Sequence, residues 1–236
     1  MMLKLYRPVK SNFIFQGFGE NLACAETDAA GKVIIPYKVL NGSYPNTCPI
    51  NSVKLYPLLG LKGHNGYDMS AWSGEPVYHS GEFDGWLKSE IDSQGGIGVD
   101  VVSNKPIALC MEGCISGTIH YVKLRGWHLK QVIGWDGKQV KMGDLIGSCD
   151  STGISGGNHL HWAPKWCAQD GAAIHEDNGY YGAFDPRMAF LAYGSYFENE
   201  FVLDVLATKA AALSAIELAR KVIFQVIQFL KGRRNS

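Results

Sequence analysis

Two short runs that contain histidine constrain this chain more than any other feature of its sequence. They are Gly63-His64-Asn65-Gly66-Tyr67-Asp68 and Gly157-Asn158-His159-Leu160-His161-Trp162. His159 and His161 stand two apart among β-forming neighbours, and residues i and i+2 of a strand point to the same face, roughly 7 Å apart. We therefore expect one imidazole to bind a metal ion while the other reaches a water molecule bound to that ion.

His64 and Asp68 supply two further ligand types that suit zinc. A straight strand would separate them by about 13 Å, so we expect the chain to bend between them, and Gly63 and Gly66 make a bend cheap. With one histidine of the pair they give three protein ligands. Catalytic zinc has three such ligands and an open fourth position, whereas structural zinc normally has four, usually including cysteine.

A zinc-bound water still needs a general acid and base. The sequence lacks the His-Glu-x-x-His helix that supplies a glutamate in many metalloproteases. We therefore expect the unused histidine of the pair to serve, together with another histidine from elsewhere in the chain.

These motifs resemble those of the lysostaphin-like (LytM-type) zinc endopeptidases, which cut the peptide cross-links of bacterial peptidoglycan. The family's His-x-x-x-Asp matches His64 and Asp68, and its His-x-His matches His159 to His161. Residues 151–158 resemble the Ser/Thr/Gly lead-in to that second motif. Residues 126–129 resemble the family's Tyr-x-His-Leu segment, and residues 140–147 resemble the Val-x-x-Gly-x-x-Ile-Gly that follows it. The similarity covers the range from about residue 50 to about residue 192.

The resemblance implies the cofactor, the site and the reaction. Zn²⁺ would be held by His64, Asp68 and His161, and His128 and His159 would line the reacting centre. We expect these two histidines to position or deprotonate the water, stabilise the oxyanion and return a proton to the leaving amine, without dividing the roles between them. The implied substrate and partner is bacterial peptidoglycan.

The same resemblance and the strand pattern predict a mainly β (α+β) fold. Short β-like runs, such as 99–102 and 159–163, are separated by Gly-rich turns, which favours an antiparallel sheet over a βαβ unit. The predicted zinc endopeptidase domain spans residues 1–198. Residues 15–20 resemble the segment that opens the family's catalytic domain, so the stretch between them and His64 is expected to be an inserted loop at the groove.

Three residues beside the site histidines are candidates for substrate binding. Trp127 and Trp162 adjoin His128 and His161, and we expect them to shape the groove; the alternative for both is a place in the core, where most tryptophans lie. Asn158 stands where the family usually has proline, next to His159, and bears on substrate choice.

A change of composition marks the C-terminal region, residues 199–236. Residues 201–231 contain no Gly or Pro before Lys231 and place apolar residues at helical spacing, which predicts an amphipathic helix. From Lys209 to Ser236 there are six basic residues and one acidic residue. The helix is expected to dock on protein, self-associate or contact an anionic membrane surface. Its charged residues interrupt any apolar run of transmembrane length.

Charge and cysteine content restrict the remaining possibilities. The 22 basic and 22 acidic residues balance, so nothing in the total charge predicts a nucleic-acid partner. The six cysteines form no Cys-x-x-Cys pair, which argues against a zinc ribbon or a thioredoxin motif. We interpret them as reduced, partly buried thiols, with disulfides as the alternative if the protein matures outside the cytoplasm.

The first 19 residues carry no apolar run of signal-peptide length. We therefore expect the protein to reach the cell wall after lysis, through a pore or a secretion system, or on a phage particle, as an endolysin or a virion-associated enzyme. Two alternatives keep the scaffold without the same role: a non-catalytic peptidoglycan-binding domain, and a structural phage component assembled through the C-terminal helix.

Overall fold

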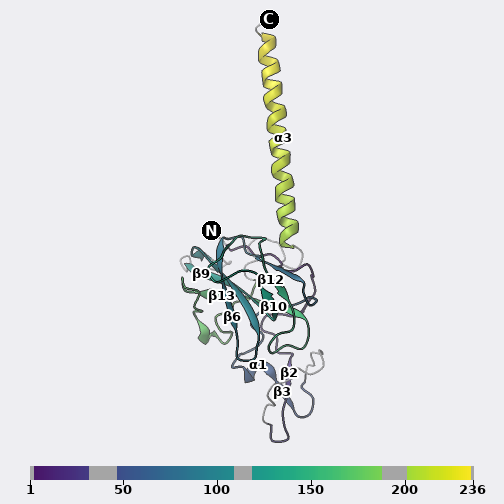
Figure 1. The fold of residues 1–236 in the computed structure, drawn as a ribbon, viewed down its shortest axis with the longest axis vertical. Coiled ribbons are helices and arrows are strands. Elements are labelled where there is room, and N and C mark those ends of the chain that lie inside the picture. The colour runs from purple at the N-terminus through teal and green to yellow at the C-terminus, as the bar shows by residue number, and fades with distance from the viewer. Residues whose placement is uncertain (1–2, 32–46, 109–118, 188–200, 235–236) are drawn as a thin grey trace. The chain divides into compact units, whose positions relative to one another are not determined.

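The structure of the protein, a computed structural model, describes residues 3–31, 47–108, 119–187 and 201–234. The chain divides into two compact units, Met1–Val202 and Leu203–Ser236. The first unit holds the β-sheets and the second holds most of the C-terminal helix (Figure 1).

An antiparallel sheet of eight strands forms the body of the first unit. In spatial order its strands are β1 (Ile14–Gln16), β4 (Tyr67–Ser70), β13 (His159–Cys167), β9 (Ile119–Trp127), β7 (Ile97–Ser103), β6 (Gly85–Ile91) and β11 (Gln139–Val140), and β8 (Ile107–Ala108) pairs with β9. The predicted mainly β fold with an antiparallel sheet is confirmed.

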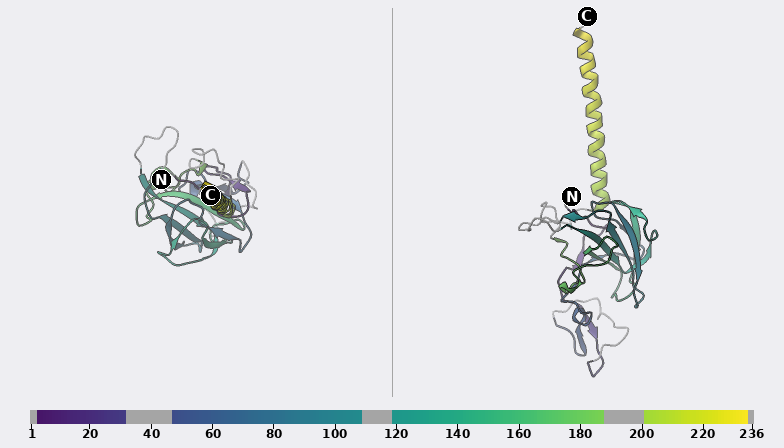
Figure 2. Two further views of the ribbon diagram at one scale, coloured as in Figure 1. Left: turned by 90° about the horizontal axis from the view of Figure 1, so that it is seen from above. Right: turned by 90° about the vertical axis from the view of Figure 1, so that its left-hand side faces the viewer.

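Two smaller sheets complete the first unit. One contains β5 (Pro76–Tyr78), β12 (Leu145–Cys149) and β10 (Leu129–Val132). The other pairs β2 (Cys24–Glu26) with β3 (Ser52–Lys54), which leads into the short helix α1 (Leu55–Leu58). We call residues 20–31 and 47–62, which contain β2, β3 and α1, the insert lobe; it lies at one end of the β body (Figures 1 and 2). A 3-10 helix, η1 (Glu176–Asn178), follows β13.

Strand alternation separates the core face of the large sheet from its other face. On β13, Leu160 and Trp162 belong to the hydrophobic core, and so do Val122 and Leu124 on β9. Successive side chains of a strand point to opposite faces, so the residues between them face away from the core. That second face carries the candidate site.

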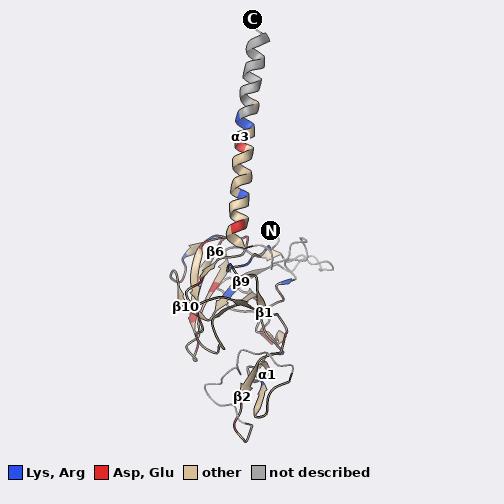
Figure 3. Cartoon of the chain, turned by 90° about the vertical axis from the view of Figure 1, so that its right-hand side faces the viewer, with Lys and Arg blue, Asp and Glu red and all other residues tan. Residues whose placement is uncertain are grey.

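The C-terminal helix α3 spans Val202–Arg234, which confirms the predicted helix. The predicted separation of α3 into an apolar and a polar face is weak. Lys209 and Glu217 stand four residues before and after Leu213 and therefore lie on the same face of the helix as this leucine. Figure 3 shows the charged residues interleaved with others along α3. Among the described residues, no helix combines the length and apolar character needed to cross a membrane.

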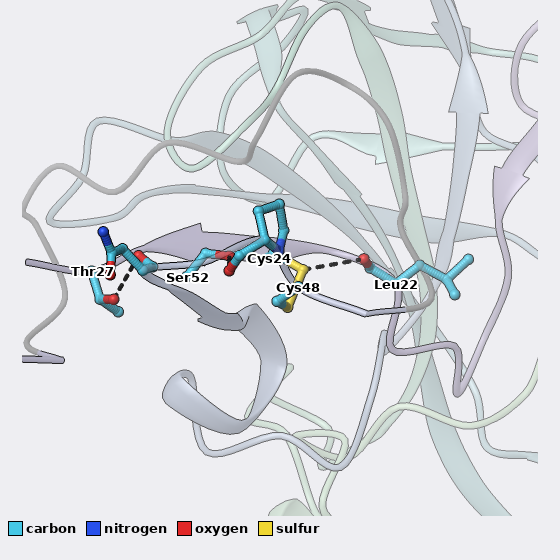
Figure 4. The surroundings of a disulfide bond; sticks show 7 residues. Leu22, Cys24, Thr27, Cys48 and Ser52 are labelled. Atoms are coloured by element: carbon cyan, nitrogen blue, oxygen red, sulfur yellow. Dashed lines mark hydrogen bonds between the residues drawn. A yellow bond between two sulfur atoms is a disulfide. The ribbon is translucent and has the colours of Figure 1, made fainter.

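The insert lobe contains a disulfide between Cys24 and Cys48 (Figure 4). Our interpretation of the cysteines as reduced thiols is therefore wrong for this pair, which closes a loop with a sequence separation of 24. It holds for Cys149 and Cys167, which are free and buried, whereas Cys110 and Cys114 lie outside the described residues. A small apolar cluster of Ala23, Ala25, Leu55, Tyr56 and Leu61 forms the interior of this lobe.

Candidate functional site

Three ligand atoms meet where β4 and β13 pair. Asp68 on β4 is directly opposite His161 on β13, and His64 lies just before β4. His64 Nε2 is 3.0 Å from Asp68 Oδ1 and 2.9 Å from His161 Nδ1, and His161 Nδ1 is 3.0 Å from Asp68 Oδ1. A tetrahedral site with zinc–ligand bonds of 2.0–2.1 Å has edges of about 3.3 Å. The three residues therefore fit a zinc ion closely.

Glycine at position 66 permits this convergence. A Cβ atom there would lie 2.6 Å from the Trp162 carbonyl oxygen and 2.8 Å from His161 Cε1, too close for any other residue without a shift of β13. The chain passes against the edge of the His161 ring and then enters β4. The predicted bend between His64 and Asp68 is thus present, and the lack of a side chain at Gly66 lets the backbone there approach β13 closely.

A backbone carbonyl orients His64. Its Nδ1 lies 3.1 Å from the Gly17 carbonyl oxygen, and an N–H at that position would donate to this acceptor. The lone pair is then on Nε2, which faces Asp68 and His161. A hydrogen bond of this kind from the distal ring nitrogen is what fixes metal-ligating histidines in proteins.

The other two candidate histidines lie beside the three ligands. His159 is two residues before His161 on β13, with its Nε2 3.6 Å from Asp68 Oδ1. His128 follows β9 with a left-handed backbone, φ 65°, and its ring centroid is 4.5 Å from that of His159. A non-glycine residue in this region is uncommon and marks a position worth functional scrutiny.

One loop holds both of these rings. His128 Nδ1 lies 2.7 Å from the Thr152 carbonyl oxygen, and His159 Nδ1 lies 2.8 Å from that of Gly157. Each Nδ1–H donates to its carbonyl, so each Nε2 is the nitrogen left for proton transfer. The Thr152 hydroxyl donates to the Leu129 carbonyl and accepts from the Ile97 N–H, which holds the loop against two strands.

Burial and neighbouring charges set the protonation of the site. Burial raises the pKa of Asp68, but His64, His159 and His161 outweigh it and hold that pKa well below its ordinary value. Burial lowers the pKa of His161 to about 4. Burial, with His159 and His161, lowers the pKa of His128 to about 3. At neutral pH Asp68 is ionised and His161 is neutral, as metal binding requires.

All five predicted histidine and aspartate residues line one cavity of about 360 Å³. The insert lobe supplies one wall, with Leu55 and Tyr56 among its lining residues, and the large sheet supplies the floor, including Arg125 and Lys165. The predicted place of the insert at the groove agrees with this arrangement. A cavity of this size accommodates part of a peptide rather than a whole protein surface.

The three residues expected to bind substrate lie in three different places relative to the cavity. Trp127 lines the cavity. Trp162 is 2% exposed and lies in the hydrophobic core, so its predicted contact with substrate is wrong; it follows His161 and therefore points to the other face of β13. Asn158 is exposed beside His159 and does not line the cavity, and its role stays a prediction.

The sequence motifs did not indicate Tyr56. Its ring lies against His64, with centroids 5.5 Å apart, and its hydroxyl accepts a hydrogen bond of 2.5 Å from Gln16 Nε2. Gln16 belongs to the segment recognised as the start of the domain, but no signal links it to a tyrosine 40 residues later. Only the fold brings the insert lobe against the metal ligands.

The sequence matches no protein-family model and no curated protein. The structure matches a zinc-containing peptidase from Vibrio cholerae, with a TM-score of 0.42 and 20% identity over 71% of this chain and 38% of that one. It also matches the catalytic domain of the antimicrobial peptidase lysostaphin from Staphylococcus simulans (TM-score 0.39, 24% identity, 56% of this chain and 80% of that one). A third match is LytU, with a TM-score of 0.42 and 18% identity over 78% of this chain and 85% of that one. The matched region spans well under half of the Vibrio cholerae peptidase.

Proposed function

We propose that this chain is a zinc-dependent endopeptidase that hydrolyses the peptide cross-links of bacterial peptidoglycan. One observation carries the proposal: three metal-ligand atoms within 3.0 Å of one another share a cavity with two histidines whose Nδ1 atoms are bound to carbonyls. Three ligands leave a position open for water, which is typical of catalytic rather than structural zinc. The substrate class comes from the resemblance of the sequence motifs to LytM-type enzymes.

The chemistry divides between the metal and the side chains. Zinc held by His64, Asp68 and His161 would make a bound water acidic and polarise a substrate carbonyl. The Nε2 atoms of His128 and His159 are placed to take a proton from the attacking water and to return one to the leaving amine.

The insert wall offers a further polar group to the substrate. Tyr56 lines the cavity, and the hydrogen bond that its hydroxyl accepts from Gln16 polarises the O–H. An O–H at this wall is suited to donate to the oxygen on which charge develops.

The test measures zinc per chain and the release of amino groups from purified peptidoglycan. The proteins are the parent, His159→Ala and a matched control, His120→Ala, whose ring packs against Trp166 outside the cavity. Walls with direct and with bridged cross-links are both used. We expect one zinc in all three proteins and cleavage by the parent and the control alone.

Other outcomes would contradict parts of the proposal. Zinc in the parent without cleavage of any wall would favour the non-catalytic binding domain. Absence of zinc from the parent would overturn the metal site itself. Loss of zinc from His159→Ala would make His159 a ligand rather than a proton-transfer residue.

Delivery by a phage particle stays a separate prediction. Zymography of purified particles beside the host lysate tests it. Activity in the particles would support a virion-associated enzyme, and activity in the lysate alone would favour an endolysin.

A further inference from the structure

Lys165 is a buried lysine on the cavity floor that the proposed chemistry does not use. It lies four residues after His161 on the same face of β13, which places it about 13 Å along the strand. Only 5% of the residue is exposed, and it lines the cavity. The floor therefore extends from the three candidate metal ligands to the ammonium group of a largely buried lysine.

The neighbouring cations of this sheet face already have carboxylate partners. Lys123, opposite Lys165 on β9, donates to Asp100 Oδ2 at 2.9 Å and to the Gly171 carbonyl at 2.9 Å. Arg125 donates to both oxygens of Asp100, at 2.7 and 2.9 Å, and also contacts Glu90. Among the described residues, none accepts a hydrogen bond or forms an ion pair with the Lys165 ammonium group.

An ammonium group buried without a partner is unfavourable. Burial, Arg125 and Lys123 lower the pKa of Lys165 to about 7, although Asp100 and the exposed Glu176 raise it. A methionine or leucine would fill the same space at no electrostatic cost. The presence of an unpaired positive charge in this position is explained if a negatively charged ligand forms an ion pair with it.

We propose that Lys165 forms an anion subsite that binds a carboxylate group of the peptide substrate. This rests on the proposed function, because that function places a peptide in the cavity. An extended peptide advances 3.3–3.6 Å per residue, so the bound carboxylate belongs to a residue about three or four positions from the cleaved bond. Leu59 and Leu61 also line the cavity, and apolar surface beside an ion pair lowers the local dielectric constant and strengthens the pair.

The test compares untreated peptidoglycan with the same material after its carboxyl groups are converted to carboxamides by carbodiimide and ammonia. The parent should cleave the untreated form about tenfold faster, the effect of one charge-assisted hydrogen bond. Lys165→Met should cleave both forms at one rate. Lys105→Met, which removes an exposed lysine elsewhere, should keep the preference of the parent. An unchanged preference in Lys165→Met would overturn the subsite.

Thermal unfolding distinguishes a binding role from a structural one. Removal of an unpaired buried charge should raise the melting temperature of Lys165→Met while the preference for carboxylates is lost. A fall in melting temperature together with an unchanged preference would show that Lys165 supports the fold instead.

A binding measurement separates failure of this subsite from failure of the proposed peptidase. Soluble peptidoglycan fragments, free or converted to carboxamides, are titrated into the zinc-loaded parent and Lys165→Met in a calorimeter. A carboxylate preference that depends on Lys165 would support the subsite even if no bond is cut. Equal affinity of the parent for both fragments would overturn the subsite even if the enzyme is active.

Discussion

The two walls of the cavity are built in different ways. The sheet wall carries the five candidate site residues on or directly beside β4, β9 and β13. Strands β9 and β13 pair over seven residues and cover the main core. The insert wall has two strands of three residues, a four-residue helix and a small cluster closed by one disulfide. The candidate site residues thus lie on the wall with the longer strand pairing, and the opposite wall is a lobe with its own small apolar cluster and disulfide.

The largest effect is expected when one of the three candidate metal ligands on the sheet wall is replaced. Asp68→Asn removes the charge that two histidines surround, so we expect loss of zinc and a fall in cleavage of at least about a thousandfold, as the water is no longer activated. Metal analysis and amino-group release measure both. Retained zinc with full activity would show that the site does not use Asp68.

The second prediction concerns the stability of the sheet wall. Burial raises the pKa of Asp100, but Arg125 and Lys123 outweigh it and hold that pKa below its ordinary value. Asp100→Asn leaves these cations without their buried partner, and we expect a loss of about 3 kcal/mol in the free energy of unfolding. Urea denaturation of the parent and the variant measures it.

The pH dependence of this effect has a definite sign. Because the folded-state pKa of Asp100 is lowered, its carboxylate stabilises the fold above the unfolded-state value of about 4, and this stabilisation is lost as the pH falls below it. The difference in the free energy of unfolding between the parent and Asp100→Asn should therefore become smaller in acid. A constant gap from neutral pH to pH 3 would contradict the ion-pair explanation.

The third prediction asks whether the insert wall takes part in the chemistry. Tyr56→Phe removes a hydroxyl at the cavity, so we expect kcat to fall about tenfold or more while zinc stays bound. Steady-state kinetics measures the split between kcat and KM. A change in KM alone would give this wall a binding role only.

The fourth prediction tests the separate stabilisation of the insert lobe. Replacement of Cys24 and Cys48 by serine opens the disulfide loop, and we expect KM to rise several-fold while zinc content and the main unfolding transition change little. Hydrogen exchange should show faster opening confined to the lobe. A large fall in global stability would show that the two walls unfold together.

The smallest effect is expected from the C-terminal helix. A chain that ends after Leu206 keeps the buried residues Phe201 and Val202 and removes a helix whose side chains are exposed from Ala207 to Lys221. We expect unchanged zinc content and cleavage of soluble fragments. Light scattering of the two chains shows whether the helix mediates self-association.

The sequence was most informative where spacing alone determines geometry. His159 and His161 share a strand face because side chains alternate. Asp68 lies directly opposite His161 because their two strands, β4 and β13, are neighbours in the sheet. The same rule places Trp162 on the core face and Lys165 on the cavity face, so both could have been predicted by extending it along β13. The error for Trp162 came from treating adjacency in sequence as adjacency in space.

The insert wall was beyond the reach of sequence patterns. The contact of Tyr56 with Gln16 and His64 depends on how a lobe with short strands folds back on the sheet, and no periodicity encodes it. The Cys24–Cys48 pairing is equally hidden, because six cysteines allow fifteen complete pairings. Such features depend on tertiary contacts between segments far apart in the chain.

The hydrogen bonds from His128 and His159 to the carbonyls of Thr152 and Gly157 bear on how a site of this kind can evolve. A carbonyl group is present whatever side chain its residue carries, so these anchors depend on the path of the loop and not on its side chains. Substitutions at exposed positions such as Gly156 and Asn158 can then alter the surface of this loop without moving the two rings. Variation of the loop surface and retention of the ring positions would then act on separate parts of the same few residues.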